Sequence, residues 1–212
     1  MRTIEVRASV VQRLALVIAV APFALFANAA SAESPNDIVD EAVLFLAAGI
    51  DGRKEELAQD KQALYALINE MLLPRFDRKY AAQLVLGRHW RSADESQKQR
   101  FTAAFYDSLL HRYADGVLEF DAGRVKVLTF RGDASKKRTT VKTIVRLNDG
   151  TKVAVNYGLV RRDVGWFIFD VTIEGVSYIR NYRAEVDSEI RSTSLVAVIE
   201  RLESEAGITA RE

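Results

Sequence analysis

One stretch near the C-terminus limits the possible folds more than any other part of the chain. Residues 165–173 (GWFIFDVTI) form an apolar and aromatic run rich in β-forming residues, which predicts a strand. Apolar residues then recur about once per helical turn, at Val176, Ile179 and Tyr182, so a helix follows the strand. A strand that is apolar on both faces must be covered on both sides. It is either a central core strand or a strand that lines a cavity for an apolar ligand.

The N-terminus has the features of a secretory signal peptide. Three arginines precede the apolar run 14–26, which is too short to cross a bilayer comfortably, and residues 30–32 (ASA) offer a small-residue cleavage site. We predict that residues 1–32 are removed on export to a bacterial periplasm and that residues 33–212 form a single domain. Since no later stretch reaches about 18 uninterrupted apolar residues, we expect that domain to be soluble.

Charge and cysteine content exclude several classes of protein. The chain has 30 basic and 29 acidic residues, and removing the three arginines and one glutamate of the predicted signal peptide leaves a net charge near −1. The domain therefore has no global positive field of the kind that nucleic-acid-binding proteins use. The chain contains no cysteine, which excludes disulfides, a cysteine-linked lipid anchor and thiol chemistry. The domain must fold on its core alone.

The first half of the predicted domain has helical periodicity. Residues 38–46, 64–72 and 76–86 each place apolar side chains on one side of a helix. The clearest helix follows residues 92–95 (SADE), which resemble a capping box. Its apolar residues recur at every fourth position, at Phe101, Phe105, Leu109 and Tyr113. A stripe with this spacing winds around the helix, as expected for a helix that packs on a twisted sheet.

From Arg124 onward the period changes to two, which predicts antiparallel strands. The loop at residues 148–150 (NDG) determines the register of one hairpin. A two-residue Asp-Gly loop would place Val153 opposite Arg146, whereas a three-residue loop with a left-handed glycine pairs Val153 with Val145. We therefore predict the three-residue loop. It gathers one apolar face from Val141, Val145, Val153, Val155, Tyr157 and Leu159.

The next connection, residues 161–164 (RRDV), leaves the register of the last strand open. Either Trp166 and Ile168 or Phe167 and Phe169 join the apolar face, since the strand is apolar on both sides. The predicted fold is α+β, with a helical N-terminal half packed on a curved four-stranded antiparallel sheet and closing C-terminal helices. Such a fold can enclose an apolar cavity. Strands of about nine residues, roughly 30 Å long, are compatible with an acyl ligand.

Several sequence motifs extend over nearly all of the predicted domain. They are residues 84–90 (LVLGRHW), Phe101 with Phe105, residues 166–177 (WFIFDVTIEGVS), residues 181–183 (NYR) and residues 188–190 (SEI). Together they resemble the MlaC family of periplasmic phospholipid-binding proteins, which are also called toluene-tolerance proteins. The C-terminal motif is long enough to be specific.

This resemblance implies a periplasmic shuttle that carries glycerophospholipids as cargo and needs no cofactor. Its implied partners are an inner-membrane ABC transporter complex with its lipid-binding subunit and an outer-membrane lipoprotein complex. Its implied role is to maintain the lipid asymmetry of the outer membrane. The alternative is a periplasmic binding protein for another hydrophobic small molecule or solvent.

A lipid carrier has to cover the acyl chains and can leave the head group in water. Two chains carry roughly 30 methylenes, and exposing them at ~0.8 kcal/mol each would cost on the order of 20 kcal/mol. The candidate lipid-binding residues are Leu67, Met71, Phe105 and Leu109 from the helices and Val145, Val155, Tyr157, Ile168 and Phe169 from the sheet. For each of them taken alone, ordinary core is the more common role, because apolar faces usually pack on each other. We expect no metal site.

The chain lacks the usual catalytic motifs. His89 and His111 are the only histidines, and neither HExxH nor GxSxG occurs. Asp170 and Glu174 lie four residues apart, and a buried carboxylate there could act as the base of a hydrolase or isomerase. We expect structural roles instead, with Asp170 accepting hydrogen bonds and Glu174 capping the helix that follows. The sequence thus predicts a protein that is not an enzyme.

Overall fold

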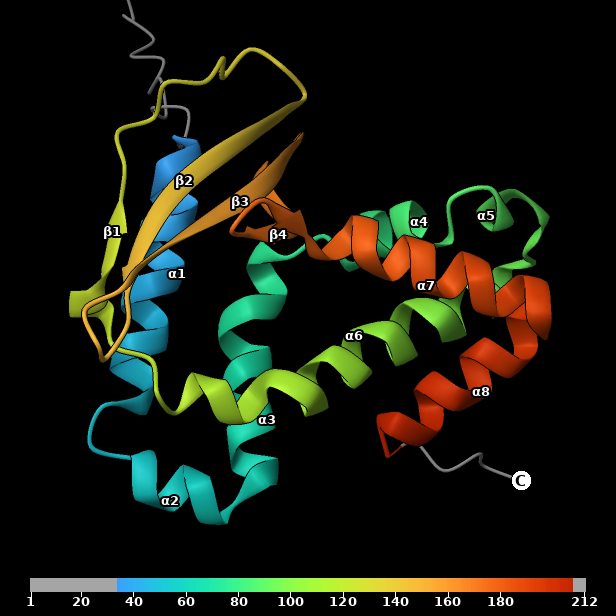
Figure 1. The fold of residues 1–212 in the computed structure, drawn as a ribbon, viewed down its shortest axis with the longest axis horizontal. Helices are drawn as coiled ribbons and strands as arrows, with labels where there is room; N and C mark the ends of the chain where they lie inside the picture. Colours follow the sequence, from blue (N-terminus) through green and yellow to red (C-terminus); the bar gives the residue numbers. More distant parts are fainter. Residues whose placement is uncertain (1–33, 208–212) are drawn as a thin grey trace, which may run out of the picture. The chain divides into compact units, whose positions relative to one another are not determined.

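The computed structural model describes residues 34–207 (Figure 1). This part of the chain contains eight α-helices, two short 3₁₀ helices and one antiparallel sheet of five strands. The predicted α+β fold is therefore confirmed, although the sheet has five strands instead of four. The predicted signal peptide, residues 1–32, lies outside the described residues.

The helices fall into an N-terminal group and a C-terminal pair, and all five strands lie between them in the sequence. They are α1 (Pro35–Ile50), α2 (Lys54–Gln59), α3 (Lys61–Leu72), η1 (Leu73–Arg75), α4 (Arg78–Leu86), α5 (His89–Ser92), α6 (Glu95–Val117), η2 (Ala122–Arg124), α7 (Tyr178–Ser192) and α8 (Leu195–Glu205). The capping box of α6 lies two residues later than predicted, with Asp94 accepting from the Gln97 amide at 2.8 Å. Ser92 instead ends α5, where its hydroxyl donates to the carbonyl of His89. None of the described helices is long and apolar enough to cross a membrane.

The strands follow one another in the order of the sequence. They are β1 (Val125–Val127), β2 (Arg138–Arg146), β3 (Lys152–Arg162), β4 (Gly165–Ile173) and β5 (Val176–Ser177). Val145 pairs with Val153, and Gly150 has a φ of 84°, so the three-residue loop predicted for this hairpin is confirmed. This register places Val141, Val145, Val153 and Val155 on the same face.

The structure also defines the register between β3 and β4. A two-residue connection makes Leu159 the partner of Ile168, which puts Trp166 and Ile168 on the apolar face. A bulge between Gly158 and Leu159 leaves Phe169 without a partner residue on β3. Bulges bend a strand and change the direction of its side chains. This bulge therefore explains how Ile168 and Phe169, which are adjacent in β4, both line the same cavity.

Asp170, within β4, links this strand to the start of α7. Its carboxylate accepts hydrogen bonds from the Ser177 hydroxyl at 2.6 Å and from the Ile179 amide at 3.1 Å. Ser177 is in turn the N-cap residue of α7. The carboxylate therefore satisfies an otherwise free amide in the first turn of the helix, as expected for an acidic group at a helix N-terminus.

Glu174 does not cap α7, contrary to the prediction. It lies in the turn between β4 and β5 with a φ of 48°, and its carboxylate accepts from the Ala154 amide of β3. With Gly175, also at positive φ, it reverses the chain tightly enough for β5 to pair with β4. This short pairing is the fifth strand, and it delays the start of the helix to Tyr178.

The buried side chains form three clusters. One lies among α4, α6, α7 and α8, and a second joins α2 and α3 to α6. In the third, α1 packs on the sheet through Ile38 and Val39, which meet Leu159, Trp166 and Ile168. Figure 1 shows α1 running along the sheet while α6 and α7 extend away from it. The end of β4 is thus covered by different helices from those that cover β2.

A glycine at the end of α4 should be difficult to replace. Gly87 has a φ of 55°, and an added Cβ would lie 2.9 Å from Nε of Arg183. We expect Gly87→Ala to lower the free energy of unfolding by about 1–2 kcal/mol, measured by urea denaturation. Gly116→Ala is the control, because Gly116 lies within α6 with open space around it and should gain about 0.5–1 kcal/mol. Equal effects at the two sites would contradict this account.

Candidate functional site

An apolar cavity of about 420 Å³ lies where α3, α6 and α7 meet the sheet. Isoleucine, leucine, valine, phenylalanine and tyrosine side chains from these elements build most of its wall. Arg75 and Asp170 are the charged residues among those that line it. The cavity exists because α1 covers only part of the apolar face of the sheet, and the helices beyond it do not fill the remaining space.

Five of the candidate lipid-binding residues lie together in the cavity wall. Phe105 and Leu109 come from successive turns of α6, Tyr157 comes from β3, and Ile168 and Phe169 come from β4. The winding stripe of α6 and the bulge in β4 bring these residues together. Their assignment to a ligand stays a prediction.

The other four candidates are not among the residues that line this cavity, and their assignment to a ligand also stays a prediction. Leu67 and Met71 pack toward α1, within about 3 Å of where a Cβ on Gly49 would lie. Val145 and Val155 are half-buried on the apolar face of the sheet, nearer to the hairpin loop. Helical and strand periodicity identified the correct faces, but it could not show which part of each face remains open.

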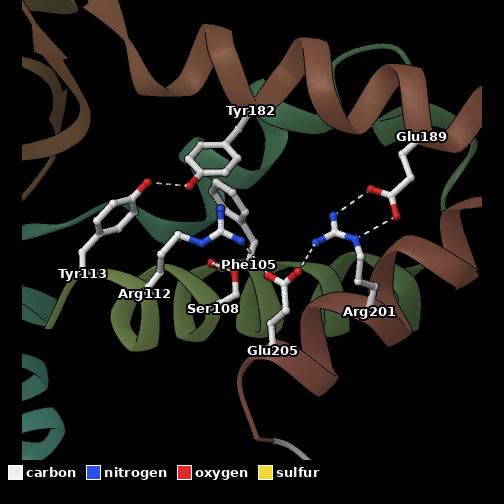
Figure 2. Close-up of polar contacts among 8 residues, drawn as sticks. All are labelled: Phe105, Ser108, Arg112, Tyr113, Tyr182, Glu189, Arg201 and Glu205. Carbon is white, nitrogen blue, oxygen red and sulfur yellow. Dashed lines mark hydrogen bonds and ion pairs between the residues drawn. The ribbon is translucent and has the colours of Figure 1, made fainter. Parts of the chain in front are cut away.

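Four tyrosines that the sequence analysis did not select also line the cavity, namely Tyr106, Tyr113, Tyr178 and Tyr182. The hydroxyls of Tyr113 and Tyr182 lie 3.0 Å apart in a hydrogen bond between α6 and α7 (Figure 2). Tyr178 packs edge-on against Tyr113, and Tyr182 packs edge-on against Phe105. Burial raises the pKa of Tyr182, so this part of the wall is uncharged. Of these tyrosines, Tyr113 could have been predicted from the sequence, because it continues the apolar stripe of α6 after Phe105 and Leu109.

The charged groups of the wall are already paired within the protein. Arg75 forms an ion pair with Glu41 of α1 at 2.8 Å, and its guanidinium lies over the ring of Phe45 at 4.5 Å. Its Nε is buried without a hydrogen-bond partner. Asp170 is occupied by Ser177 and the first turn of α7. The cavity therefore offers a ligand mainly apolar surface.

Ion pairs join α6 and α7, which line the cavity, to α8. Figure 2 shows Arg201 of α8 between Glu189 of α7 and Glu205, with N–O distances of 2.6–2.8 Å. Arg112 of α6 also pairs with Glu205, at 3.0 Å. The buried hydroxyl of Ser108 donates to a carbonyl of its own helix. These contacts tie α6, α7 and α8 together without placing charge in the cavity.

Neither histidine lies in the cavity wall. His89 contacts Asp187 at 2.8 Å, and the ring of His111 stacks on Tyr65 with centroids 4.3 Å apart. Within residues 34–207 there is no group of three or more His, Asp or Glu side chains able to hold a metal ion.

Tyr106 should make stability depend on alkaline pH. Burial raises its pKa to about 12, against about 10 in an unfolded chain. Between these values the unfolded state loses a proton that the folded state keeps, so stability is intact below pH 10 and falls above it. Tyr106→Phe should reduce this fall while costing about 1 kcal/mol at neutral pH, through loss of its bond to Asn69. Urea denaturation of both proteins at pH 9 and pH 11 would test this. An equal loss of unfolding free energy between the two pH values in the wild type and the variant would contradict it.

Comparison with known proteins identifies the family. The sequence model of the MlaC protein family matches residues 44–204, from within α1 to within α8. The chain belongs to the MlaC family. All five cavity residues that the sequence analysis selected fall inside this match, so the cavity is formed by the MlaC-family part of the chain.

Two curated MlaC-family relatives align over most of their length. The toluene tolerance protein ttg2D of Pseudomonas putida is 27% identical over 172 residues, covering 81% of this chain and 79% of the relative. The intermembrane phospholipid transport system binding protein MlaC of Haemophilus influenzae is 20% identical over 169 residues, covering 78% and 79%.

A solved structure has the same fold. The phospholipid-binding protein of Ralstonia solanacearum, determined in complex with a phospholipid, matches with a TM-score of 0.75 and 23% identity. The match covers 84% of this chain and all of that one. The MlaC-family fold predicted from the sequence is thus confirmed.

Proposed function

We propose that this protein carries glycerophospholipids in the periplasm, with the acyl chains in the cavity between α6 and the sheet. The observation that carries the proposal is a cavity whose wall is apolar and whose charged residues are paired within the protein. Family membership supports it, as do relatives named for phospholipid transport and phospholipid binding.

A carrier of phospholipids must keep the acyl chains out of water, and the apolar wall of the cavity meets this requirement. Leaving two acyl chains in water would cost on the order of 20 kcal/mol, and an apolar wall removes most of that cost. A charged head group would pay a desolvation penalty inside the cavity and is better left in water. The protein would therefore select its ligand by the volume and shape of the tails.

The proposed carrier acts by binding alone. It is not an enzyme and uses no cofactor, since the carboxylate closest to the cavity, Asp170, is occupied by structural hydrogen bonds. The chain would be exported by its N-terminal signal peptide. It would exchange lipid with an inner-membrane ABC transporter complex, through that complex's lipid-binding subunit, and with an outer-membrane lipoprotein complex. This exchange would maintain the lipid asymmetry of the outer membrane.

Native mass spectrometry of the protein purified from a bacterial periplasm without detergent tests the proposal. We expect a mass increment equal to a whole number of phospholipids, with the lipid identified after extraction. A protein that is purified empty, and that takes up no lipid from phospholipid vesicles, would overturn the proposal. A bound hydrophobic compound other than a phospholipid would support the alternative binding protein.

A further inference from the structure

A second feature of the structure is a basic surface formed by α4, α5 and α7. It contains two hollows that share Arg88 and Arg183, and we call it the arginine surface. Arg180 belongs to the first hollow and Arg91 to the second, and all four arginines are exposed. None of the four lines the apolar cavity.

The arginine surface has an excess of positive charge that the protein itself does not neutralise. Asp187 is the acidic residue of the two hollows, and it already contacts Arg88 at 2.9 Å, His89 at 2.8 Å and Arg191 at 3.5 Å. Within residues 34–207, Arg180 and Arg183 form no ion pair. This local excess stands out in a chain whose formal net charge is only +1.

One arginine of this surface lies close to the backbone of Gly87. Nε and Nη2 of Arg183 each lie 2.9 Å from the position that a Cβ on Gly87 would occupy. The guanidinium thus lies against the turn between α4 and α5, beside the space that Gly87 leaves open.

We propose that the arginine surface docks a protein partner that presents carboxylate side chains. The hollows combine arginines with Trp90 and Tyr80 and with aliphatic walls from Leu84 and Leu86. Arginine, tryptophan and tyrosine are the residues enriched at protein interfaces, and the guanidinium fork matches a carboxylate in two-point geometry. A flat anionic membrane would not require concave hollows with aromatic walls.

The arginine surface and the apolar cavity are formed by different sides of the same helix. Tyr178, Ile179 and Tyr182 of α7 line the cavity, while Arg180 and Arg183 project to the arginine surface. A partner docked there would lie one helix away from the cavity. The docking proposal goes beyond the proposed function and does not require the cargo to be a phospholipid.

A labelled acidic peptide tests this proposal. Fluorescence anisotropy would measure binding of a fluorescein-labelled peptide, rich in glutamate and tryptophan, to the full mature protein. We expect saturable binding that weakens as salt is added. Arg180→Glu combined with Arg183→Glu should weaken it by at least about tenfold. Arg91→Glu, on a different helix, should weaken it in the same direction.

The control is Lys126→Glu combined with Arg146→Glu, which makes the same charge change at exposed positions of the sheet and should alter binding by less than about twofold. Equal binding by the wild type and the Arg180/Arg183 variant, or no saturable binding by the wild type, would overturn the proposal. Arg183-dependent binding to phosphatidylglycerol vesicles without peptide binding would overturn it in favour of a membrane contact. Lipid content, measured on each variant by mass spectrometry, reports separately on the proposed carrier function.

Discussion

Replacing Leu109 with aspartate is expected to abolish lipid retention while the protein still folds. Leu109 lies in the cavity wall on α6 and is only partly buried, so without lipid the new carboxylate can remain hydrated. With acyl chains in place the charge would be desolvated without a partner, at a cost of several kcal/mol. We expect the lipid content to fall below about one-tenth of the wild-type value, measured by native mass spectrometry.

Two variants separate this effect from a general effect of mutation. Leu109→Met keeps the volume and apolar character of the wall and should retain its lipid. Val164→Asp adds the same charge in the turn between β3 and β4, at a side chain that is 84% exposed, and should also retain it. A folded Leu109→Asp protein with a normal lipid load would remove this residue from the lipid-binding wall.

Replacing Asp170 with alanine is expected to lower the free energy of unfolding by about 2–4 kcal/mol. The change removes the acceptor for both the Ser177 hydroxyl and the Ile179 amide, at the junction that starts α7. Hydrogen bonds to a charged group contribute about 1.5–3 kcal/mol each, and the two are not independent. Urea denaturation followed by circular dichroism measures the loss.

Asp163→Ala is the matched control, because Asp163 is exposed in the turn that precedes β4 and should change stability by less than about 0.5 kcal/mol. Ser177→Ala should cost less than Asp170→Ala, and the double variant should cost less than the sum of the two. A loss below about 1 kcal/mol for Asp170→Ala would show that this junction is held by other contacts. Any Asp170→Ala protein that folds should still contain lipid, since we assign this residue a structural role.

The local spacing of apolar residues was sufficient to predict much of the fold. A change from helical to twofold periodicity near Arg124 separated the helical half from the sheet, and the valines around the loop at 148–150 defined its register. Both signals can be read within a short stretch of sequence. At the 148–150 loop, for example, a register shifted by one residue would turn the neighbouring valines to the opposite face. The sequence motifs, with the one between Trp166 and Ser177 the most specific, similarly indicated the family.

The local sequence around Glu174 predicted the wrong hydrogen-bond partner for its carboxylate. Glu174 follows an apolar strand and precedes a helix, which favoured a capping role, yet its carboxylate bonds to Ala154 of the neighbouring strand. The tight turn that Glu174 forms with Gly175 adds a fifth strand too short to show a period. Two residues cannot display an alternation, so only the pairing itself reveals this strand.

The sequence by itself determined which faces of the helices and strands are apolar, because that follows from spacing along the chain. Only the tertiary structure decided which parts of those faces remain open. Phe169 enters the cavity wall beside a bulge, whereas Val155 on the neighbouring strand does not. Whether an apolar side chain becomes core or cavity wall depends on segments far away in sequence that pack against it, and the local pattern carries no information about their distance.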